Sequence, residues 1–357
     1  MLGLLRARLS AGRRPGAFGL DIGSRAIKVL ELRSTRSSHA VARCARVPIA
    51  AGIAAEGAIH DVPAAAAAIR AAVNAAGITH AEAAVGICGR ELIIKRLQIP
   101  EVPARELGRA IRIEAEHQIP FDIDEVLLGY QITAQQNRLV DLTLVAAKKS
   151  KVMEYCAAVT AAGCAPVVVD VDGFALGNQR ELTAPDETDR TALVDVGATM
   201  TKIAIVGGRL THFVRDVPFG GDRYSHAIAA RLGVAIEEAE TIKTAAARNP
   251  APELVAQACA EVSRDLGREI QRALDYHTES DVTAHPATRV ALVGGGAALA
   301  GLGQALGAIL GLPVAVSDPF AGLPVDASCA AAIACAGPTM ALALGLGLRR
   351  PGDGVTP

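Results

Sequence analysis

Two segments of the chain share one pattern of apolar and polar positions. Residues 17–33 (AFGLDIGSRAIKVLELR) and 191–210 (TALVDVGATMTKIAIVGGRL) each contain an apolar stretch ending in Asp, an Asp-x-Gly turn, and a second stretch of nearly alternating apolar residues. Alternation of this kind predicts a β-hairpin in both places. Because a duplicated hairpin indicates two similar domains, we expect two domains that face each other across a ligand-binding cleft.

The pattern between and after the hairpins predicts the remaining organisation. Residues 61–76 form an Ala-rich helical pattern followed by a strand, and the segment after Gly89 predicts strand, helix, strand, strand and a returning helix. A polar segment, 181–190, predicts a linker, and residues 222–285 are mainly helical. We expect the following parts: a tail (1–16), a first domain (17–89, 166–190 and 338–357), an inserted subdomain (90–165), a second domain (191–222 and 285–337) and a helical cap (223–284).

Composition and charge narrow the class of protein. The chain has 357 residues, a net charge of -1 and 3% aromatic residues without Trp. Its length favours two domains, while the neutral charge and few aromatics argue against nucleic-acid binding. Its seven Cys form no CxxC pair, which predicts a reduced compartment and no structural zinc.

Two terminal segments raise the question of a membrane. The N-terminal arginines interleave with leucines, and we favour a frayed tail over a lipid-touching helix; these arginines are Arg6, Arg8, Arg13 and Arg14. The apolar run before them is too short for a signal peptide. Residues 330–348 are apolar over about twenty positions, the length of a bilayer span. Because Gly337 and Pro338 interrupt this run, a buried helix begun by Pro338 is the preferred interpretation.

The two Asp-x-Gly turns carry the candidate chemistry. A triphosphate with Mg²⁺ needs backbone N–H groups that approach its oxygens and carboxylates that position the metal and its waters. Both turns combine a strand-ending Asp, a Gly and a hydroxyl residue, and the first adds a Lys; the candidates are Asp21, Gly23, Ser24, Lys28, Asp195, Gly197 and Thr199. Asp21 and Asp195 are the metal-side and catalytic candidates. One such turn alone is more often a plain hairpin turn.

A glycine-rich turn late in the chain supplies a third part. Residues 290–302 (VALVGGGAALAGL) predict a strand that runs through Gly294, Gly295 and Gly296 into a helix. A dinucleotide-binding turn is the alternative, but its glycines would be spaced G-x-G-x-x-G and an acidic residue would follow. We therefore favour a mononucleotide site.

In this order the three parts resemble the phosphate and adenosine motifs of the actin/Hsp70/sugar-kinase superfamily. The resemblance implies an α/β actin-like ATPase fold with two duplicated ribonuclease-H-like domains around a nucleotide cleft. It also implies that Glu240 and Lys243, in the A-E-x-x-K segment 239–243, contact the nucleoside; an ordinary surface ion pair is the alternative. Asp172 is a candidate for positioning water, with a helix N-cap as the equal alternative.

Several phrases further resemble the PilM family of type IV pilus assembly proteins. They include FGLDIGSRAIKVLEL, IPFDIDEV within the insert and RDVPFGGD in the second half. The chain departs from the family at Arg25, where a small hydroxyl residue is usual, and at Ala198, and both departures weaken the expectation of hydrolysis. The resemblance implies an FtsA-type inserted subdomain, ATP with Mg²⁺ as ligand, and at most a slow ATPase.

The same resemblance implies partners and a location. It implies a cytoplasmic protein, peripheral at the inner membrane, that binds the N-terminal cytoplasmic tail of PilN and other pilus assembly proteins, with homo-oligomer formation open. The tail would lie in a groove between the first domain and the insert. Plausible contributors are Ile93, Leu97, Ile99 and Leu107, with a plain core role for these apolar residues as the alternative. The alternatives are an FtsA-like division filament protein and a small-molecule kinase. The ending RRPGDGVTP does not predict the amphipathic helix of the former, and nothing in the first domain predicts a polar sugar pocket for the latter.

Overall fold

Two five-stranded sheets with the same strand order form the centre of the molecule. A computed structural model describes residues 16–35, 38–246, 252–280 and 284–352. The first sheet has the order β10-β6-β1-β2-β3, from β1 (Phe18–Ile22), β2 (Ala26–Ser34), β3 (His39–Pro48), β6 (Glu82–Ile87) and β10 (Ala165–Val171). The second has the order β13-β12-β11-β14-β15, from β11 (Thr191–Val196), β12 (Thr201–Gly207), β13 (Leu210–Val217), β14 (Arg289–Val293) and β15 (Val314–Val316).

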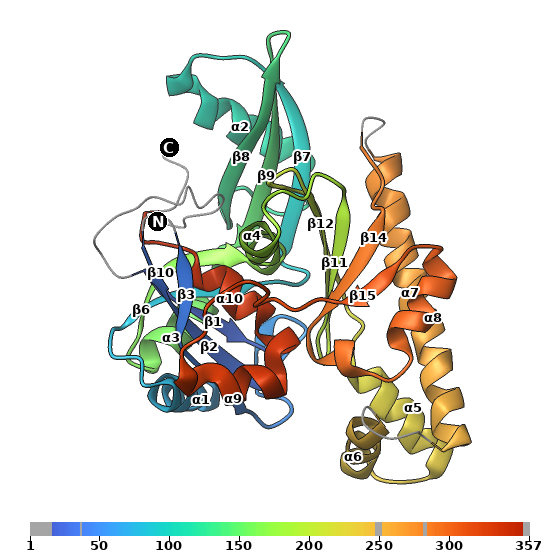
Figure 1. The fold of residues 1–357 in the computed structure, drawn as a ribbon. Helices are drawn as coiled ribbons and strands as arrows, with labels where there is room; N and C mark the ends of the chain where they lie inside the picture. The colour runs from blue at the N-terminus through green and yellow to red at the C-terminus, as the bar shows by residue number, and fades with distance from the viewer. Residues whose placement is uncertain (1–15, 36–37, 247–251, 281–283, 353–357) are drawn as a thin grey trace.

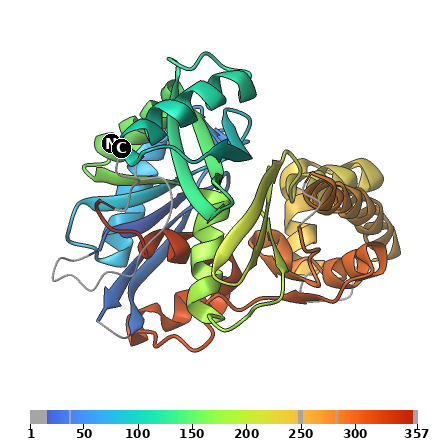
Figure 2. The ribbon, with the colours of Figure 1, turned by 90° about the horizontal axis from the view of Figure 1, so that it is seen from above.

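Strand directions repeat as well. In each sheet the first three strands run antiparallel as a meander, and the two later strands add in parallel on the other side. Figure 2, seen from above, shows the two halves side by side. The duplication predicted from the repeated hairpins is therefore confirmed.

Helices cover the first sheet and connect it to the second half. α1 (Val62–Ala76) contacts β2 and β3, and α3 (Lys149–Ala161) lies beside α1, β6 and β10. α1 begins where Asp61 caps the amide of Ala64 and ends at Gly77, whose positive φ closes the helix. Between β3 and α1 lies a small hairpin of β4 (Ala54–Ala55) and β5 (Ala58–Ile59). This hairpin reaches the cleft described below.

Two helices are exchanged between the sheets. α4 (Asp172–Thr183) follows the first sheet but contacts β12 and β13, whereas α10 (Ala341–Gly347) follows the second sheet but contacts β1 and β2. α4 and α10 cross at backbone distance, because a Cβ on Gly345 would lie 1.8 Å from the carbonyl oxygen of Ala175. The exchange ties the two domains together at their centre, as Figure 1 shows.

The predicted linker is shorter than expected. Residues 181–183 form the last turn of α4, so the connection to β11 begins at Ala184. Within it, Glu187 forms ion pairs with Arg180 and Arg289 and accepts a hydrogen bond from Thr191. Three polar contacts therefore hold this segment in place, although its polar composition predicted only a linker.

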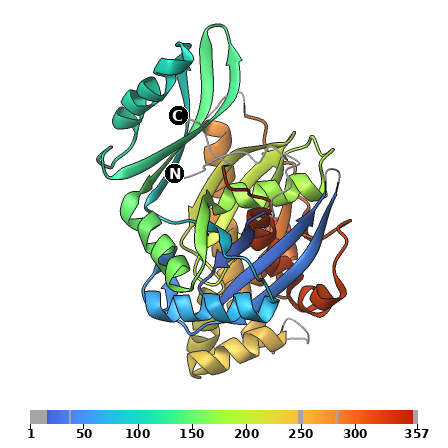
Figure 3. The same ribbon diagram turned by 90° about the vertical axis from the view of Figure 1, so that its left-hand side faces the viewer.

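The insert after Gly89 has the predicted order of strand, helix, strand and strand. β7 (Leu92–Pro100), α2 (Ala104–Gln118), β8 (Val126–Gln136) and β9 (Leu139–Lys148) form a three-stranded sheet in the order β7-β9-β8 with α2 beside it. Figure 3 shows α2, in teal, alongside this sheet. The insert has its own apolar core around Leu97, Ile111 and Leu142.

The second half carries the helical part. α5 (Asp222–Leu232), α6 (Ile236–Ala246) and α7 (Glu253–Glu279) follow β13, while η1 (Gly295–Ala298) and α8 (Leu302–Leu310) lie between β14 and β15. The side chains of Leu266 and Ile270 on α7 join the core formed with Val194 and Ile205 of the sheet. The mainly helical pattern predicted for residues 222–285 is confirmed in its described part.

The apolar C-terminal segment is divided by a short turn. By length and composition alone, residues 327–347 would suffice to cross a membrane. In the structure, α9 (Ala327–Ala336) ends before the 3-10 turn η2 (Gly337–Met340), and α10 follows with all its residues buried. The buried helix is confirmed, although it begins at Ala341 and Pro338 lies in the turn before it. The predictions for the arginine-containing tail lie outside the described residues.

Candidate functional site

A cavity of about 450 Å³ lies between the two domains, a volume within the usual range for small-molecule sites. It is lined by both Asp-x-Gly turns, by the glycine-rich turn after β14 and by α6. All the predicted site residues except Thr199 line it, namely Asp21, Gly23, Ser24, Lys28, Asp172, Asp195, Gly197, Glu240, Lys243, Gly294, Gly295 and Gly296. Tertiary structure therefore brings together residues from five separate segments of the chain.

The two turns have the same backbone geometry. The amide of Gly23 donates to the carbonyl of Ala26 at 3.2 Å, and that of Gly197 donates to Met200 at 2.9 Å. A Cβ on Gly197 would lie 2.8 Å from the Met200 oxygen, so glycine is required there. Such turns leave backbone close to the cavity, where phosphate oxygens can approach.

Thr199 lies at the seam between the turns. Its hydroxyl is 2.7 Å from that of Ser24 and accepts a hydrogen bond from the Glu56 amide at 3.0 Å. The side chain thus joins the two turns and the β4–β5 hairpin. The sequence predicted a ligand contact for Thr199, and the structure places its hydroxyl between Ser24 and the Glu56 amide.

Each turn is followed by a lysine that faces the turn's aspartate. Asp21 pairs with Lys28 across β1 and β2, and their side chains form an ion pair of 2.6 Å. Asp195 pairs with Lys202 across β11 and β12 in the equivalent register. Sequence analysis missed Lys202, although the signal was present: in both hairpins a lysine follows the aspartate by seven positions.

Lys202 is shared by two carboxylates. Its Nζ lies 3.3 Å from Asp195 and 3.2 Å from Asp172. Burial lowers the pKa of Lys202, but the two carboxylates outweigh burial and hold this pKa well above its usual range. Burial raises the pKa of Asp172 above its usual value, although the positive charge of Lys202 partly offsets this rise. The lysine is therefore a fixed positive charge beneath the cavity.

The helix-cap alternative for Asp172 is wrong. α4 is capped at Val171, without a side-chain hydrogen bond, and Asp172 is the first residue of the helix itself. Its side chain lines the cavity and forms the ion pair with Lys202. Asp172 thus lines the cavity and is held by a lysine, and its role in positioning water stays a prediction.

Glu240 and Lys243 form more than a surface ion pair. The Lys243 side chain is buried, and its Nζ donates to Glu240 at 2.5 Å, to the Ser225 hydroxyl at 2.9 Å and to the Gly221 carbonyl at 3.0 Å. Burial raises the pKa of Glu240, but hydrogen bonds from Lys243 and Ser225 dominate and lower it below its usual value. The i,i+3 ion pair of the alternative interpretation is present, with the Glu240 side chain 42% exposed, and both residues also line the cavity wall, so the nucleoside contact stays a prediction.

The glycine-rich turn brings backbone against both the sheet and the cavity. Gly294 has φ of +82°, and a Cβ there would lie 2.1 Å from the Asp195 carboxylate. At Gly295 a Cβ would meet nothing within 4 Å, and this residue lines the cavity. The turn thus supplies an open backbone surface that a flat or phosphorylated ligand fits.

Arg25 forms an ion pair across the cleft. Its guanidinium donates two hydrogen bonds, of 2.9 and 3.3 Å, to the carboxylate of Asp222 at the start of α5. The arginine that departs from the expected hydroxyl therefore joins the first turn to the second domain. Ser24 and Arg25 both contact the opposite half of the molecule.

The acidic residues do not form a metal cage by themselves. Within the described ranges, no group of three or more His, Cys, Asp or Glu side chains is arranged to hold a metal ion. Asp21 and Asp195 are each paired with a lysine. A magnesium ion here would need ligand phosphates and water for most of its coordination, as Mg²⁺ commonly does.

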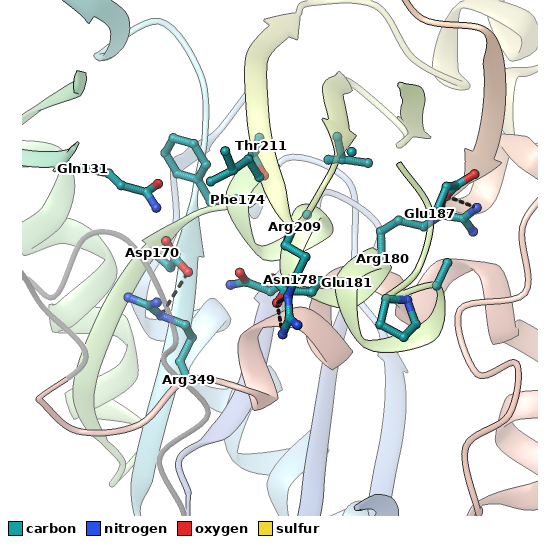
Figure 4. A pocket seen from close by; sticks show the side chains of 16 residues that line it. Gln131, Asp170, Phe174, Asn178, Arg180, Glu181, Glu187, Arg209, Thr211 and Arg349 are labelled. Atoms are coloured by element: carbon teal, nitrogen blue, oxygen red, sulfur yellow. Dashed lines mark hydrogen bonds and ion pairs between the residues drawn. The ribbon is translucent and has the colours of Figure 1, made fainter. Parts of the chain in front are cut away.

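A second, smaller cavity lies where the insert meets both domains. Figure 4 shows its lining: Gln131 from β8, Phe174 and Asn178 from α4, and Arg209 and Thr211 near the β12–β13 turn. On its floor the fully buried Arg349 and Asp170 form an ion pair of 3.2 Å. Sequence reasoning missed this site because its residues come from separate segments with no shared motif.

The residues proposed for a peptide groove divide into two groups. Leu97 and Ile99 are buried in the core of the insert, so they are not available to a partner. Ile93 and Leu107 are partly buried against the same core. Ile93, Leu97 and Ile99 lie on β7 and Leu107 lies on α2, and for Leu97 and Ile99 the structure supports a core role instead of a peptide contact.

Comparisons with known proteins agree with this architecture. A sequence model of the family "Type IV pilus assembly protein PilM" matches residues 19–351. The chain is similar to the solved "PilM-PilN type IV pilus biogenesis complex", with 28% identity, a TM-score of 0.81 and coverage of 94% of this chain and 98% of that chain.

More distant structures share the fold. The ethanolamine utilization protein EutJ from Carboxydothermus hydrogenoformans is 18% identical, with a TM-score of 0.55 and coverage of 95% of this chain and 91% of that one. MreB5 of Spiroplasma citri bound to ADP is 11% identical, with a TM-score of 0.51 and coverage of 93% and 95%. The fold is the actin-like ATPase fold expected from the repeated turns. Since the family model extends over almost the whole described chain, this protein belongs to the PilM family of type IV pilus assembly proteins.

Proposed function

We propose that this pilus assembly protein binds ATP with Mg²⁺ in the cleft between its domains and binds the N-terminal cytoplasmic tail of PilN. It would act in the cytoplasm, at the inner membrane through its partners. The observation that carries the nucleotide proposal is the cavity itself. The two Asp-x-Gly turns, the glycine-rich turn after β14 and the buried Lys243 of α6 all line this one cavity.

The residues divide into three roles. The turns at Gly23 and Gly197, with Ser24 and Lys28, would hold the phosphates, and Glu240, Lys243 and the turn at Gly294–Gly296 would hold the nucleoside. Asp21 and Asp195 would orient the waters of Mg²⁺. The metal would neutralise charge on the β- and γ-phosphates.

The arrangement favours binding over rapid turnover. Asp172, the water-positioning candidate, forms an ion pair with Lys202 through Oδ2, so one of its two carboxylate oxygens is already engaged and is not available to an attacking water. Arg25 and Asp222, which both line the cavity, form an ion pair that links its two sides. We therefore expect ATP to act as a conformational ligand, with slow hydrolysis at most.

A change at Gly295 tests the nucleotide site. Because its Cβ would point into open cavity, Gly295→Val should leave the fold intact and weaken binding of a fluorescent ATP analogue by at least about tenfold. Gly108→Val on α2 is the matched control, since a Cβ there also meets nothing within 4 Å. Equal affinity of both variants would remove the cleft as the nucleotide site.

The surface around the cavity in Figure 4, whose own volume is about 40 Å³, is the proposed contact for the PilN tail. It adjoins the insert and both domains, and the similar solved structure is titled as a complex of PilM with PilN. Asn178→Trp would fill it from α4, whereas Asn74→Trp on exposed α1 is the control. Fluorescence anisotropy with a labelled PilN N-terminal peptide, with and without Mg-ATP, should show weaker binding for Asn178→Trp alone. Failure of the peptide to bind the unaltered protein would overturn the partner proposal.

A further inference from the structure

The insert is joined to the first domain through two short junctions. The chain enters it through Cys88 and Gly89 and leaves it through the first turn of α3, which contains Lys151. The β4–β5 hairpin lies against the first junction, because a Cβ on Gly89 would lie 2.8 Å from the carbonyl oxygen of Glu56. Any movement of this hairpin therefore reaches the base of the insert.

The first junction is bonded directly to the second domain. The amide of Gly89 donates to Oδ2 of Asp216, on β13, at 2.7 Å. Asp216 pairs in register with Lys202, the lysine beneath the nucleotide cavity. The other oxygen of Asp216 is buried and accepts no hydrogen bond from the described parts of the chain. Gly89 has φ of +99°, a conformation that suits a hinge residue.

The second junction reaches the cleft through the hairpin. The buried ammonium group of Lys151 donates to the carbonyl of Gly57, at the tip of the β4–β5 hairpin. The adjacent Glu56 amide donates to Thr199, which also contacts Ser24. Both junctions of the insert therefore lead to the second Asp-x-Gly hairpin, one through Asp216 and one through Thr199.

We infer that Asp216 and Lys151 are positioning residues that transmit nucleotide-dependent movement of the second domain to the inserted subdomain. The inference rests on the proposed nucleotide site and names the route by which that site regulates the insert. A hydrogen bond from a backbone amide to a buried carboxylate is strong, and losing it leaves an uncompensated group. The junctions thus follow β13 and the hairpin when those elements move, while the core of the insert stays rigid.

The experiment measures hydrogen–deuterium exchange of residues 89–92 and 148–151 with and without a non-hydrolysable Mg-ATP analogue, alongside the affinity for that analogue. In the unaltered protein the analogue should change exchange at both junctions. Asp216→Ala should keep nucleotide affinity and reduce the change at 89–92 by about fivefold, a typical size for an allosteric coupling. Asp216→Asn, which retains an oxygen acceptor, should restore it. Asp265→Ala on the exposed face of α7 should behave like the unaltered protein.

The outcomes separate this inference from the nucleotide proposal. Absence of analogue binding to the unaltered protein would overturn the proposed nucleotide site. Normal binding with unchanged exchange at both junctions, or a full exchange response in Asp216→Ala, would overturn the transmission route alone. If Asp216→Ala fails to fold, Lys151→Met decides, because the route predicts a loss of the response at 148–151 and a retained response there contradicts it.

Discussion

The two Asp-x-Gly hairpins have the same backbone, but the strand that follows each hairpin carries a residue of opposite charge. This residue is Arg46 on β3 in the first domain and Asp216 on β13 in the second. In the first domain, Asp21, Lys28 and Arg46 occupy one cross-strand row, so two cations accompany one carboxylate. In the second domain the equivalent row is Asp195, Lys202 and Asp216, and Asp172 adds a further carboxylate from α4. The first row is suited to attracting phosphate, whereas the second concentrates carboxylates around one buried lysine.

The difference shows how the two copies of one structural unit come to contact different partners. Arg46 is exposed and lines the cavity, but Asp216 is directed to the junction with the insert. The shared Asp and Lys preserve the turn, and the third residue of each row determines what the hairpin contacts. We therefore expect perturbations of the second row to affect stability and coupling more strongly than the same changes in the first.

Replacing the central lysine should have the largest effect. Lys202→Ala leaves Asp172 and Asp195 buried without their cation, and loss of one partner from a buried ion pair costs about 3–5 kcal/mol. Lys28→Ala leaves one buried carboxylate, Asp21, instead of two, with Arg46 still in its row, and should cost less, about 1–3 kcal/mol. Urea denaturation of both variants provides the measurement. Equal losses of unfolding free energy would contradict the difference between the rows.

The pH dependence of stability should come next in size. Burial raises the pKa of Asp216 from its ordinary 3.8 to about 6. Since the folded state holds this proton more tightly, the stabilisation is present below pH 3.8 and is lost as pH rises through 6. Asp216→Asn, which does not titrate, should gain on the order of 1 kcal/mol relative to the unaltered protein between pH 5 and 7.5. A difference that stays constant over this range would contradict the assignment.

The smallest effect is expected at the mouth of the cleft. Arg25→Ser restores the hydroxyl that is usual in the family and removes the partly exposed ion pair with Asp222. Such pairs contribute at most about 1 kcal/mol, so thermal stability should fall slightly. Limited proteolysis should show a more accessible cleft without nucleotide. Asp222→Asn is the control from the other side of the pair, and opposite effects of the two variants would contradict a latch formed by this pair.

Local patterns predicted a large part of the fold and of the nucleotide site. The spacing of Asp, Gly and hydroxyl residues is a short-range feature, so the turns at Asp21 and Asp195 could be recognised without the fold. The alternation of the insert predicted its strands for the same reason. Lys202 was equally accessible, because its spacing from Asp195 repeats that of Lys28 from Asp21.

Other features depend on which segments meet. Thr199 contacts Glu56 across the cleft, Asp172 pairs with a lysine on another sheet, and Leu97 is covered by α2. The last turn of α4 extends into a polar segment because its contacts there outweigh the loop-like composition. None of these follows from local periodicity.

The sequence by itself therefore determined the duplication, the glycines of the turns and the resemblance to pilus assembly proteins. These are properties of nearby residues and of motif order. Only the tertiary structure decided that α4 and α10 exchange sheets, that Asp172 faces Lys202 and that Asp216 reaches Gly89. The physical reason is that burial and ion pairing are set by residues far apart in the chain, and their proximity exists only after both domains have formed.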